Sequence, residues 1–138
     1  VRFHFIGDLE DNRIPDENKF LMNETEQLTK NNKKLNLVFA FNYGSRKEIH
    51  DAYAKLNNNS IDQLDEEKFR ATLLLPEMPD PDLLIRTAGE KRVSNFLLYQ
   101  LSYTELMFVD TLWPDFDEKE LDSAVDEFLN RVRKYGNA

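Results

Sequence analysis

The stretch from Leu35 to Phe41 restricts the fold of this chain more than any other part of its sequence. Successive side chains of a β-strand point to opposite faces, and in this stretch both faces are apolar. One face carries Leu35, Leu37, Phe39 and Phe41, and the other carries Val38 and Ala40. A strand that is apolar on both faces is typical of a parallel sheet covered by helices. The stretch therefore predicts an α/β protein.

The rest of the chain fits this class because strands and helices alternate along it. Strands are predicted over residues 1–6, 35–41, 83–86 and 105–109, and helices over 16–33, 45–56, 65–74, 95–103 and 117–135. The predicted helix starts are marked by Ser45, Asp65, Ser94 and Asp117, with Glu48 and Glu120 at capping-box spacing. This order predicts one domain over residues 1–138, α/β in class, with a mostly parallel sheet flanked by helices.

The chain opens at Val1 without a methionine, and residues 1–6 already alternate between apolar and polar side chains as in a strand. A protein that opens in the middle of a sheet is expected to be the later part of a longer one. The fold is therefore expected to be incomplete at the N-terminus.

Composition excludes several kinds of site. The 138 residues include no cysteine and only two histidines, too few for a disulfide framework, a cysteine-based metal site or a histidine-rich zinc site. The net charge of −8 argues against nucleic acid as a partner, because the phosphate backbone attracts cationic surfaces. The longest apolar run, Leu37–Phe41, is far shorter than the roughly 18–20 residues that span a bilayer. A reducing, cytoplasmic location is expected.

The stretch from Arg86 to Phe96 gathers anion-binding groups between two apolar segments. Arg86 is expected at the carboxyl end of the strand 83–86, where open α/β sheets bind ligands. Arg86 and Arg92 each offer a planar fork of donors for phosphate oxygens, and Gly89 lets the backbone turn between them. Ser94 adds a hydroxyl and the positive end of the predicted helix 95–103. This pattern predicts a diphosphate-sized site, although two surface arginines beside an ordinary helix cap explain it equally well.

Two carboxylates accompany this stretch. Glu105, at the start of the predicted strand 105–109, is a natural ligand for Mg²⁺ if phosphates bind nearby, and is otherwise a solvated carboxylate at a strand edge. Glu90 is either a further polar group of the site or the ion-pair partner of Arg92 or Lys91.

Several segments resemble the cis-prenyltransferase family, whose bacterial representative is undecaprenyl diphosphate synthase. The segments LLIRTAGEKRVSNFLL (83–98), YTEL (103–106) and LWPDF (112–116) resemble its C-terminal signature. The segment FNYGSR (41–46) resembles the family's Asn-Tyr-Gly-Gly-Arg segment, with Ser45 in place of the second glycine. The resemblance runs from Val1 to the end of the chain without a large gap.

The resemblance implies an enzyme that condenses isopentenyl diphosphate with an allylic diphosphate, such as farnesyl diphosphate, and so adds Z double bonds repeatedly. The expected product is a polyprenyl diphosphate such as undecaprenyl diphosphate, a precursor of the cell-wall lipid carrier. By the same resemblance Arg86, Arg92 and Ser94 bind isopentenyl diphosphate, and Glu105 helps to hold Mg²⁺ and that diphosphate. Charge-assisted bonds to phosphate, and a metal that neutralises the developing pyrophosphate, agree with the chemistry of these residues.

The resemblance carries further expectations. It implies a homodimer, with the strand Met107–Val109 as a candidate contact, and a lipid product that calls for weak association with a membrane surface. Leu35 matches a position that helps close the floor of the product tunnel, although a plain core role fits the sequence better. The family's C-terminal Arg-x-Gly motif stands here as Lys134-Tyr135-Gly136, which keeps the charge.

One family motif is missing from the chain. Asp-Gly-Asn-Gly-Arg-Trp supplies the family's catalytic aspartate and the loop for the allylic diphosphate, and the resemblance puts it before Val1. No residue of this chain is therefore assigned a catalytic role, and the chain alone is expected to be inactive. A non-catalytic accessory subunit of a heteromeric cis-prenyltransferase is an alternative, disfavoured by the retained arginines. A generic phosphate-binding α/β domain is another.

Overall fold

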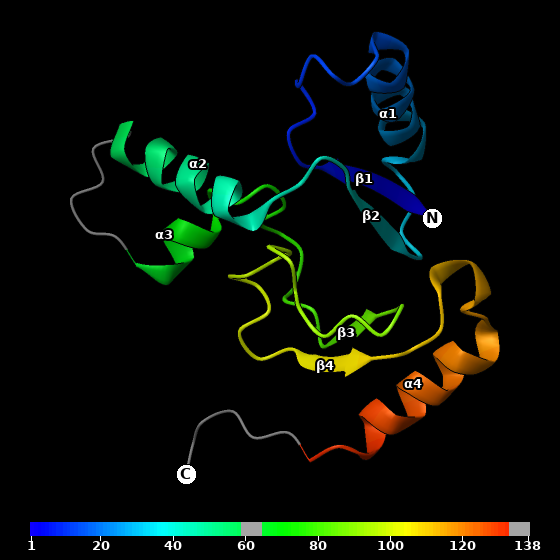
Figure 1. Cartoon of the computed structure of the whole chain (residues 1–138). Coiled ribbons are helices and arrows are strands. Elements are labelled where there is room, and N and C mark those ends of the chain that lie inside the picture. Colours follow the sequence, from blue (N-terminus) through cyan, green and yellow to red (C-terminus); the bar gives the residue numbers. More distant parts are fainter. Residues whose placement is uncertain (59–64, 133–138) are drawn as a thin grey trace. The chain divides into compact units, whose positions relative to one another are not determined.

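The computed structural model describes residues 1–58 and 65–132 and has the predicted α/β class, with parallel strands and helices (Figure 1). The chain divides into two compact units, Val1–Met78 and Pro79–Ala138. Each unit contains one pair of parallel strands. The expectation of a single domain over residues 1–138 stays a prediction. In the described part of the chain, no helix is long and apolar enough to cross a membrane.

The first unit is built on the parallel pair β1 (Arg2–Ile6) and β2 (Asn36–Ala40). Phe3 lies opposite Leu37, and Phe5 lies opposite Phe39, so these aromatic and aliphatic side chains share one face. The ring of Phe39 stacks on Phe5 at 5.5 Å and on Phe3 at 6.1 Å between centroids. Aromatic pairs of this kind favour the observed register over a slip by one residue.

Helix α1 (Asp16–Thr29) closes the outer edge of β1. The backbone N–H groups of Phe3 and Phe5 donate to Thr29 Oγ1 at 3.1 Å and to Glu26 Oε1 at 2.8 Å. An unpaired strand edge is open to association with another strand, and these side chains occupy that edge. The helix ends at Thr29 rather than at Lys33 as predicted.

Helix α2 (Ser45–Asn58) is joined to the segment after α3 (Glu66–Arg70) through a buried carboxylate. Ser45 is the first residue of α2 and is fully buried, and its predicted capping role stays a prediction. Glu48 is also buried and accepts hydrogen bonds from Tyr43 Oη at 2.5 Å and from the Leu74 N–H at 3.0 Å. These bonds connect α2 to the segments before it and after α3 within the unit. Asp65 caps α3 as predicted, through a bond from the Lys68 N–H.

The second unit is built on β3 (Leu83–Arg86) and β4 (Glu105–Phe108), which are parallel and in register from Leu83 opposite Glu105 to Arg86 opposite Phe108. A short 3₁₀ helix, η1 (Trp113–Asp115), leads to α4 (Glu118–Asn130). Met107 of β4 and Ala124 of α4 are buried. The last helix ends at Asn130, and the predicted contributions of Tyr135 and Gly136 to it lie outside the described residues.

The predicted helix over residues 95–103 is wrong. The structure has separate turns there, and Ser94, Asn95 and Leu97 have positive φ angles of 47°, 63° and 45°. A right-handed helix requires negative φ at every residue, so these three residues prevent one from starting at Ser94. Serine and asparagine bond readily to nearby backbone groups, which favours turns over a helix interior.

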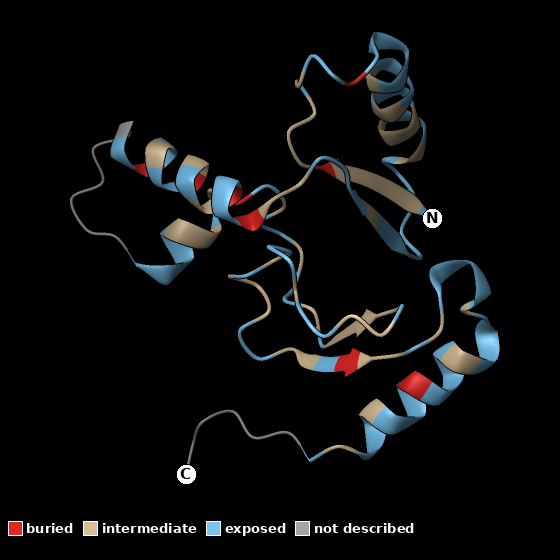
Figure 2. Cartoon of the chain, viewed as in Figure 1, coloured by how far each residue is buried: buried red, intermediate tan, exposed pale blue. Residues whose placement is uncertain are grey.

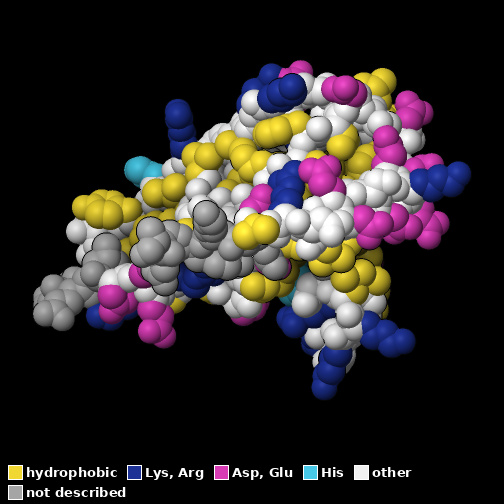
Figure 3. Space-filling view, turned by 90° about the horizontal axis from the view of Figure 1, so that it is seen from below, with side chains coloured by type: hydrophobic (Ala, Val, Ile, Leu, Met, Phe, Trp, Pro, Cys, Tyr) yellow, Lys and Arg dark blue, Asp and Glu magenta, His cyan; other side chains and the backbone are white. Residues whose placement is uncertain are grey.

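The apolar side chains of the stretch that predicted the fold are partly exposed within their own unit. Leu35, Leu37, Phe39 and Phe41 are all partly exposed, and buried residues are scattered singly along the ribbon (Figure 2). Hydrophobic side chains also reach the surface between charged groups in the space-filling view (Figure 3). The α/β class with parallel strands that this stretch predicts is confirmed.

The cap of α4 gives a testable stability effect. Asp117 Oδ1 accepts a hydrogen bond from the Glu120 N–H at 3.0 Å, as the sequence predicts. Asp117→Ala should lower the free energy of unfolding by about 1 kcal/mol, because an N–H of the first turn loses its partner. Urea unfolding followed by circular dichroism measures this, with the exposed Asp122→Ala on the same helix as control. Equal stability of the two variants would contradict the capping role.

Candidate functional site

Arg86 is the last residue of β3, at the carboxyl end of the parallel pair. Its carbonyl oxygen accepts a bond from the Val109 N–H at 2.9 Å, which continues the pairing with β4 by one residue. Ligands of open α/β sheets bind at this end of the strands because the connecting loops splay apart there. The predicted position of Arg86 is confirmed.

The loop that follows β3 is strained and is held against the end of β4. Four of the five described non-glycine residues with positive φ, namely Ala88, Ser94, Asn95 and Leu97, lie within it. The N–H groups of Ala88 and Gly89 donate to Thr111 O at 2.8 Å and Val109 O at 2.9 Å. Gly89 has a φ of +67°, as expected of the residue that turns the backbone between the two arginines. Strained backbone of this kind is concentrated at functional sites in proteins.

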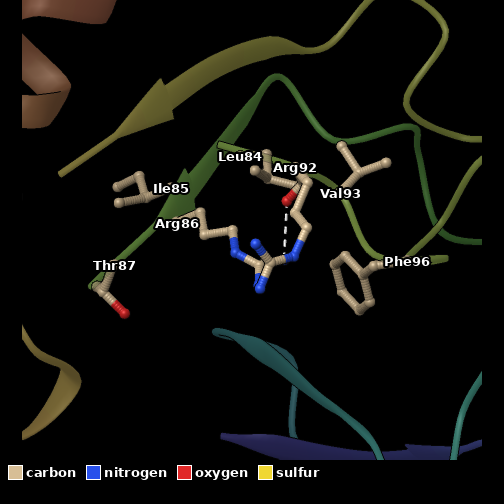
Figure 4. A pocket seen from close by; sticks show the side chains of 7 residues that line it. All are labelled: Leu84, Ile85, Arg86, Thr87, Arg92, Val93 and Phe96. Carbon is tan, nitrogen blue, oxygen red and sulfur yellow. Dashed lines mark hydrogen bonds between the residues drawn. The ribbon is translucent and has the colours of Figure 1, made fainter. Parts of the chain in front are cut away.

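The structure brings Arg86 and Arg92 together. Arg86 Nη1 donates to the backbone oxygen of Arg92 at 2.7 Å, and both side chains extend into the same space beside Phe96 (Figure 4). They line a cavity of about 230 Å³ with Leu84, Ile85, Thr87, Val93 and Phe96. One guanidinium therefore contacts the backbone that carries the other, and the role of the two arginines in binding an anion stays a prediction.

Glu90 forms an ion pair with Arg92. This resolves the two roles that the sequence left open in favour of pairing with Arg92. The Arg92 side chain is nevertheless 62% exposed, so its charge is accessible to an anion from solvent. Glu90 thus neutralises part of the positive charge of Arg92.

Ser94 is close to the arginines in the chain but lies at the margin of the site. It is exposed, and it is not among the residues that line the cavity, although its neighbour Val93 is. Because no helix starts at Ser94, the expected helix N-terminus with its positive dipole is absent. The groups that face an anion here are therefore side chains rather than the end of a helix.

Glu105 is separated from the arginines. It is the first residue of β4 and lies opposite Leu83, three positions along β3 from Arg86, which is about 10 Å at about 3.3 Å per residue. Side chains alternate along a strand, so Glu105 also points to the face opposite that of Arg86. Within one chain the structure does not bring Glu105 to the Arg86 cavity.

Glu105 instead contacts Arg131, the residue that follows α4. Its Oε2 accepts a bond from Arg131 Nη1 at 2.9 Å. Arg131 also bonds Glu127 Oε1 at 2.5 Å, and the two residues are spaced i, i+4, as in helical ion pairs. The spacing of four residues is the sequence feature from which the pairing of Arg131 with Glu127 could have been predicted. Nothing in the sequence pairs Arg131 with Glu105, because the strand and the helix end are far apart in the chain.

The chemistry of Glu105 suits Mg²⁺ only in part. Among residues 1–58 and 65–132, no group of three or more His, Asp or Glu side chains lies close enough together to hold a metal ion. Mg²⁺ is commonly held by one or two carboxylates together with phosphate oxygens of a substrate. A single carboxylate such as Glu105 is therefore compatible with Mg²⁺ binding if a diphosphate supplies the other ligands. Any further ligands would have to come from a substrate or from groups outside these ranges.

The remaining predicted residues lie elsewhere. Leu35 precedes β2 in the first unit, where it is 57% exposed, and both its core role and its tunnel role stay predictions. Lys134, Tyr135 and Gly136 lie outside the described residues.

Together these features describe a parallel α/β unit with paired arginines at the carboxyl end of a strand, a class of site that binds phosphorylated ligands. A sequence model of the family described as "Putative undecaprenyl diphosphate synthase" matches residues 1–136. The isoprenyl transferase of Fusobacterium nucleatum is 46% identical over 136 residues, which are 99% of this chain and 58% of that protein. The ditrans,polycis-undecaprenyl-diphosphate synthase ((2E,6E)-farnesyl-diphosphate specific) of Micrococcus luteus is 44% identical, over 99% of this chain and 56% of that protein.

The structural comparison agrees with the sequence comparison. Lavandulyl diphosphate synthase from Lavandula x intermedia, solved in complex with dimethylallyl diphosphate, is similar with a TM-score of 0.90 and 36% identity, over 98% of this chain and 60% of that one. The chain belongs to the cis-prenyltransferase family, as its motifs predict. It spans 56–58% of the length of the two curated relatives.

Proposed function

We propose that this chain supplies the isopentenyl diphosphate site of a transferase that elongates a prenyl chain with Z double bonds. The second substrate would be an allylic diphosphate such as farnesyl diphosphate, and the product a polyprenyl diphosphate such as undecaprenyl diphosphate. One observation carries the proposal: Arg86 and Arg92 converge on one cavity at the carboxyl end of β3. The names of the two curated relatives support the class of reaction.

In this proposal the two arginines bind and orient the diphosphate. Arg86 holds the loop through the Arg92 carbonyl and presents its remaining donors to phosphate oxygens. The ion pair between Arg92 and Glu90 breaks, and Arg92 binds the diphosphate instead. The hydroxyl group of Ser94 contributes a further hydrogen bond from the margin of the cavity. The apolar side chains of Leu84, Val93 and Phe96 line the same cavity, and we propose that they receive the isopentenyl group.

The position of Glu105 adds a homodimer to the proposal. A carboxylate at the opposite end and face of the strand pair is poorly placed to serve the diphosphate held by Arg86 of the same chain. We propose that Glu105 of one copy serves the site of the other copy, where Mg²⁺ would neutralise diphosphate charge. The strand segment Met107–Val109 remains the proposed dimer contact.

The other parts of the proposed function concern a longer protein. The aspartate expected before Val1 would act on the allylic diphosphate, so the 138 residues alone are expected to bind diphosphate without turnover. Leu35 would limit product length. The enzyme would be cytoplasmic, with weak association at a membrane surface where its lipid product leaves.

Calorimetric titration of this chain distinguishes the proposed ligand from other phosphorylated ligands. Isopentenyl diphosphate should bind more tightly than isopentenyl monophosphate, because a diphosphate can contact both guanidinium groups. ADP should bind weakly, since the proposed pocket is sized for an isopentenyl group. Tight binding of ADP and none of isopentenyl diphosphate would favour a generic phosphate-binding domain instead.

The ion pair of Glu90 with Arg92 predicts a gain of affinity on mutation. Glu90→Gln should tighten the binding of inorganic pyrophosphate about threefold, because an exposed ion pair of up to about 1 kcal/mol no longer competes with the anion. Glu118→Gln, the same change at an exposed position of α4, is the control and should leave the calorimetric dissociation constant unchanged. Weaker binding by Glu90→Gln would show that Glu90 positions Arg92 for the ligand rather than competing with it.

A further inference from the structure

Arg131 ties the end of α4 to the start of β4. Its Nη1 bonds Glu105 Oε2 at 2.9 Å and the Leu106 carbonyl oxygen at 3.1 Å, and its Nη2 bonds Glu127 Oε1 at 2.5 Å. Arg131 is the C-cap residue of α4, and its own N–H donates to Phe128 O. One guanidinium thus joins a strand carboxylate, a strand carbonyl and the last turn of a helix.

The Arg131–Glu105 pair is better shielded from water than the Arg92–Glu90 pair. The two side chains are 27% and 28% exposed, compared with 62% and 39% for Arg92 and Glu90. The bonds to Glu127 and then to Glu105 raise the pKa of Arg131, which is charged at every physiological pH in any case. Glu105 therefore always faces a cationic partner when no metal is bound.

A divalent cation that uses Glu105 must compete with this partner. The Arg131 guanidinium occupies Oε2, and a second positive charge beside that oxygen would repel the cation. Release of Arg131 is made easier by Glu127, which continues to pair with it from the helix. Arg131 thus has two acidic partners, and it can lose its bond to Glu105 while it stays paired with Glu127.

We propose that Arg131 and a divalent cation compete for Glu105, so that Arg131 sets the cation affinity and cation binding releases the end of α4 from β4. This inference rests on the proposed function, in which Glu105 is the cation ligand. Arg131 acts here through Glu105 and is a positioning residue. A purely structural role for Arg131 predicts the opposite sign, since loosening α4 would disorder Glu105 and weaken cation binding.

Titration of the chain with Mn²⁺ alone, followed by paramagnetic broadening of the amide signals of Glu105 and Leu106, tests the competition. Arg131→Gln should reach half-maximal broadening at about one-fifth of the Mn²⁺ concentration needed by the wild type. Arg131→Lys, which keeps the charge but loses the fork, should fall between the two. Glu127→Gln leaves Glu105 as the sole carboxylate partner of Arg131 seen here and should require more Mn²⁺ than the wild type.

Two controls make the outcomes distinct. Arg13→Gln removes one positive charge from an ion pair with Asp11 in the other unit, and it should leave the titration unchanged. Glu105→Gln should abolish the broadening. Unchanged or weaker Mn²⁺ binding by Arg131→Gln, or no broadening at these amides in any variant, would overturn the inference. Shifts of the amides of residues 86–93 on addition of inorganic pyrophosphate report the proposed diphosphate site independently, so failure of that site is recognised separately.

Discussion

Arg86→Ala should weaken the binding of inorganic pyrophosphate to this chain by about 100-fold, or about 2.7 kcal/mol. The substitution removes a bidentate donor to phosphate, for which charge-assisted bonds contribute roughly 1.5–3 kcal/mol. It also removes the bond from Arg86 Nη1 to the Arg92 carbonyl oxygen, which holds the second arginine at the cavity. Isothermal calorimetry measures the effect, and in an enzyme of the relatives' length the KM for isopentenyl diphosphate should rise steeply.

Graded variants separate charge from geometry at this position. Arg86→Lys keeps the charge and loses the fork, so an intermediate loss of about tenfold is expected. Arg92→Ala should also cost about tenfold, because Arg92 is more exposed and is already paired with Glu90. Arg13→Ala, a surface arginine paired with Asp11, is the matched control and should bind pyrophosphate as the wild type does. Equal affinities for Arg86→Ala and Arg13→Ala would remove Arg86 from the site.

Mixed dimers should recover activity that neither parent variant has. If Glu105 serves the site of the other copy, a dimer of an Arg86→Ala chain and a Glu105→Ala chain contains one intact site and one doubly altered site. An equal mixture of the two chains, in an enzyme of the relatives' length, should then show about one quarter of the wild-type rate, since about half of the dimers are mixed. The rate of allylic chain elongation after refolding the chains together measures this.

The mixture should behave differently if Glu105 serves the site of its own chain. Both sites of every mixed dimer would then carry one defect, and the mixture would be as inactive as its parents. The control mixture pairs Arg86→Ala with Arg92→Ala, because both arginines line the same cavity of one chain. That mixture should show no recovery. Recovery there and none with Glu105→Ala would contradict the placement of Glu105 at the second copy's site.

The class of the fold and the position of Arg86 at a strand end were predictable because their signals are local. A strand that is apolar on both faces predicts parallel pairing, and both strand pairs are parallel. The polar groups after Ile85 predict the carboxyl end of a strand, and Arg86 lies there. The caps at Asp65 and Asp117 were also predictable, since a single side chain and the next turn decide each.

The predicted helix after Ser94 was wrong because helical periodicity competed with turn chemistry. Leu97, Leu98 and Leu101 have helical spacing, but positive φ at Ser94, Asn95 and Leu97 interrupts the helix. Periodicity reports which residues share a face and carries no information on the sign of φ.

The partner of Glu105 could not be predicted because it depends on how α4 meets β4. Glu105 and Arg131 are separated by 26 positions in the chain, and many acidic and basic residues lie between them. The opposite facing of Arg86 and Glu105 follows from the register of β3 and β4, which the sequence leaves open. The arrangement of the candidate residues therefore could not be predicted from the sequence.

A crystal structure of this chain soaked with isopentenyl diphosphate tests the central claim most directly. The account predicts diphosphate oxygens at about 3 Å from the guanidinium groups of both Arg86 and Arg92, with the Glu90 ion pair broken. It also predicts the isopentenyl group against Val93 and Phe96. A diphosphate bound elsewhere, with the Arg86 cavity unchanged, would contradict the account.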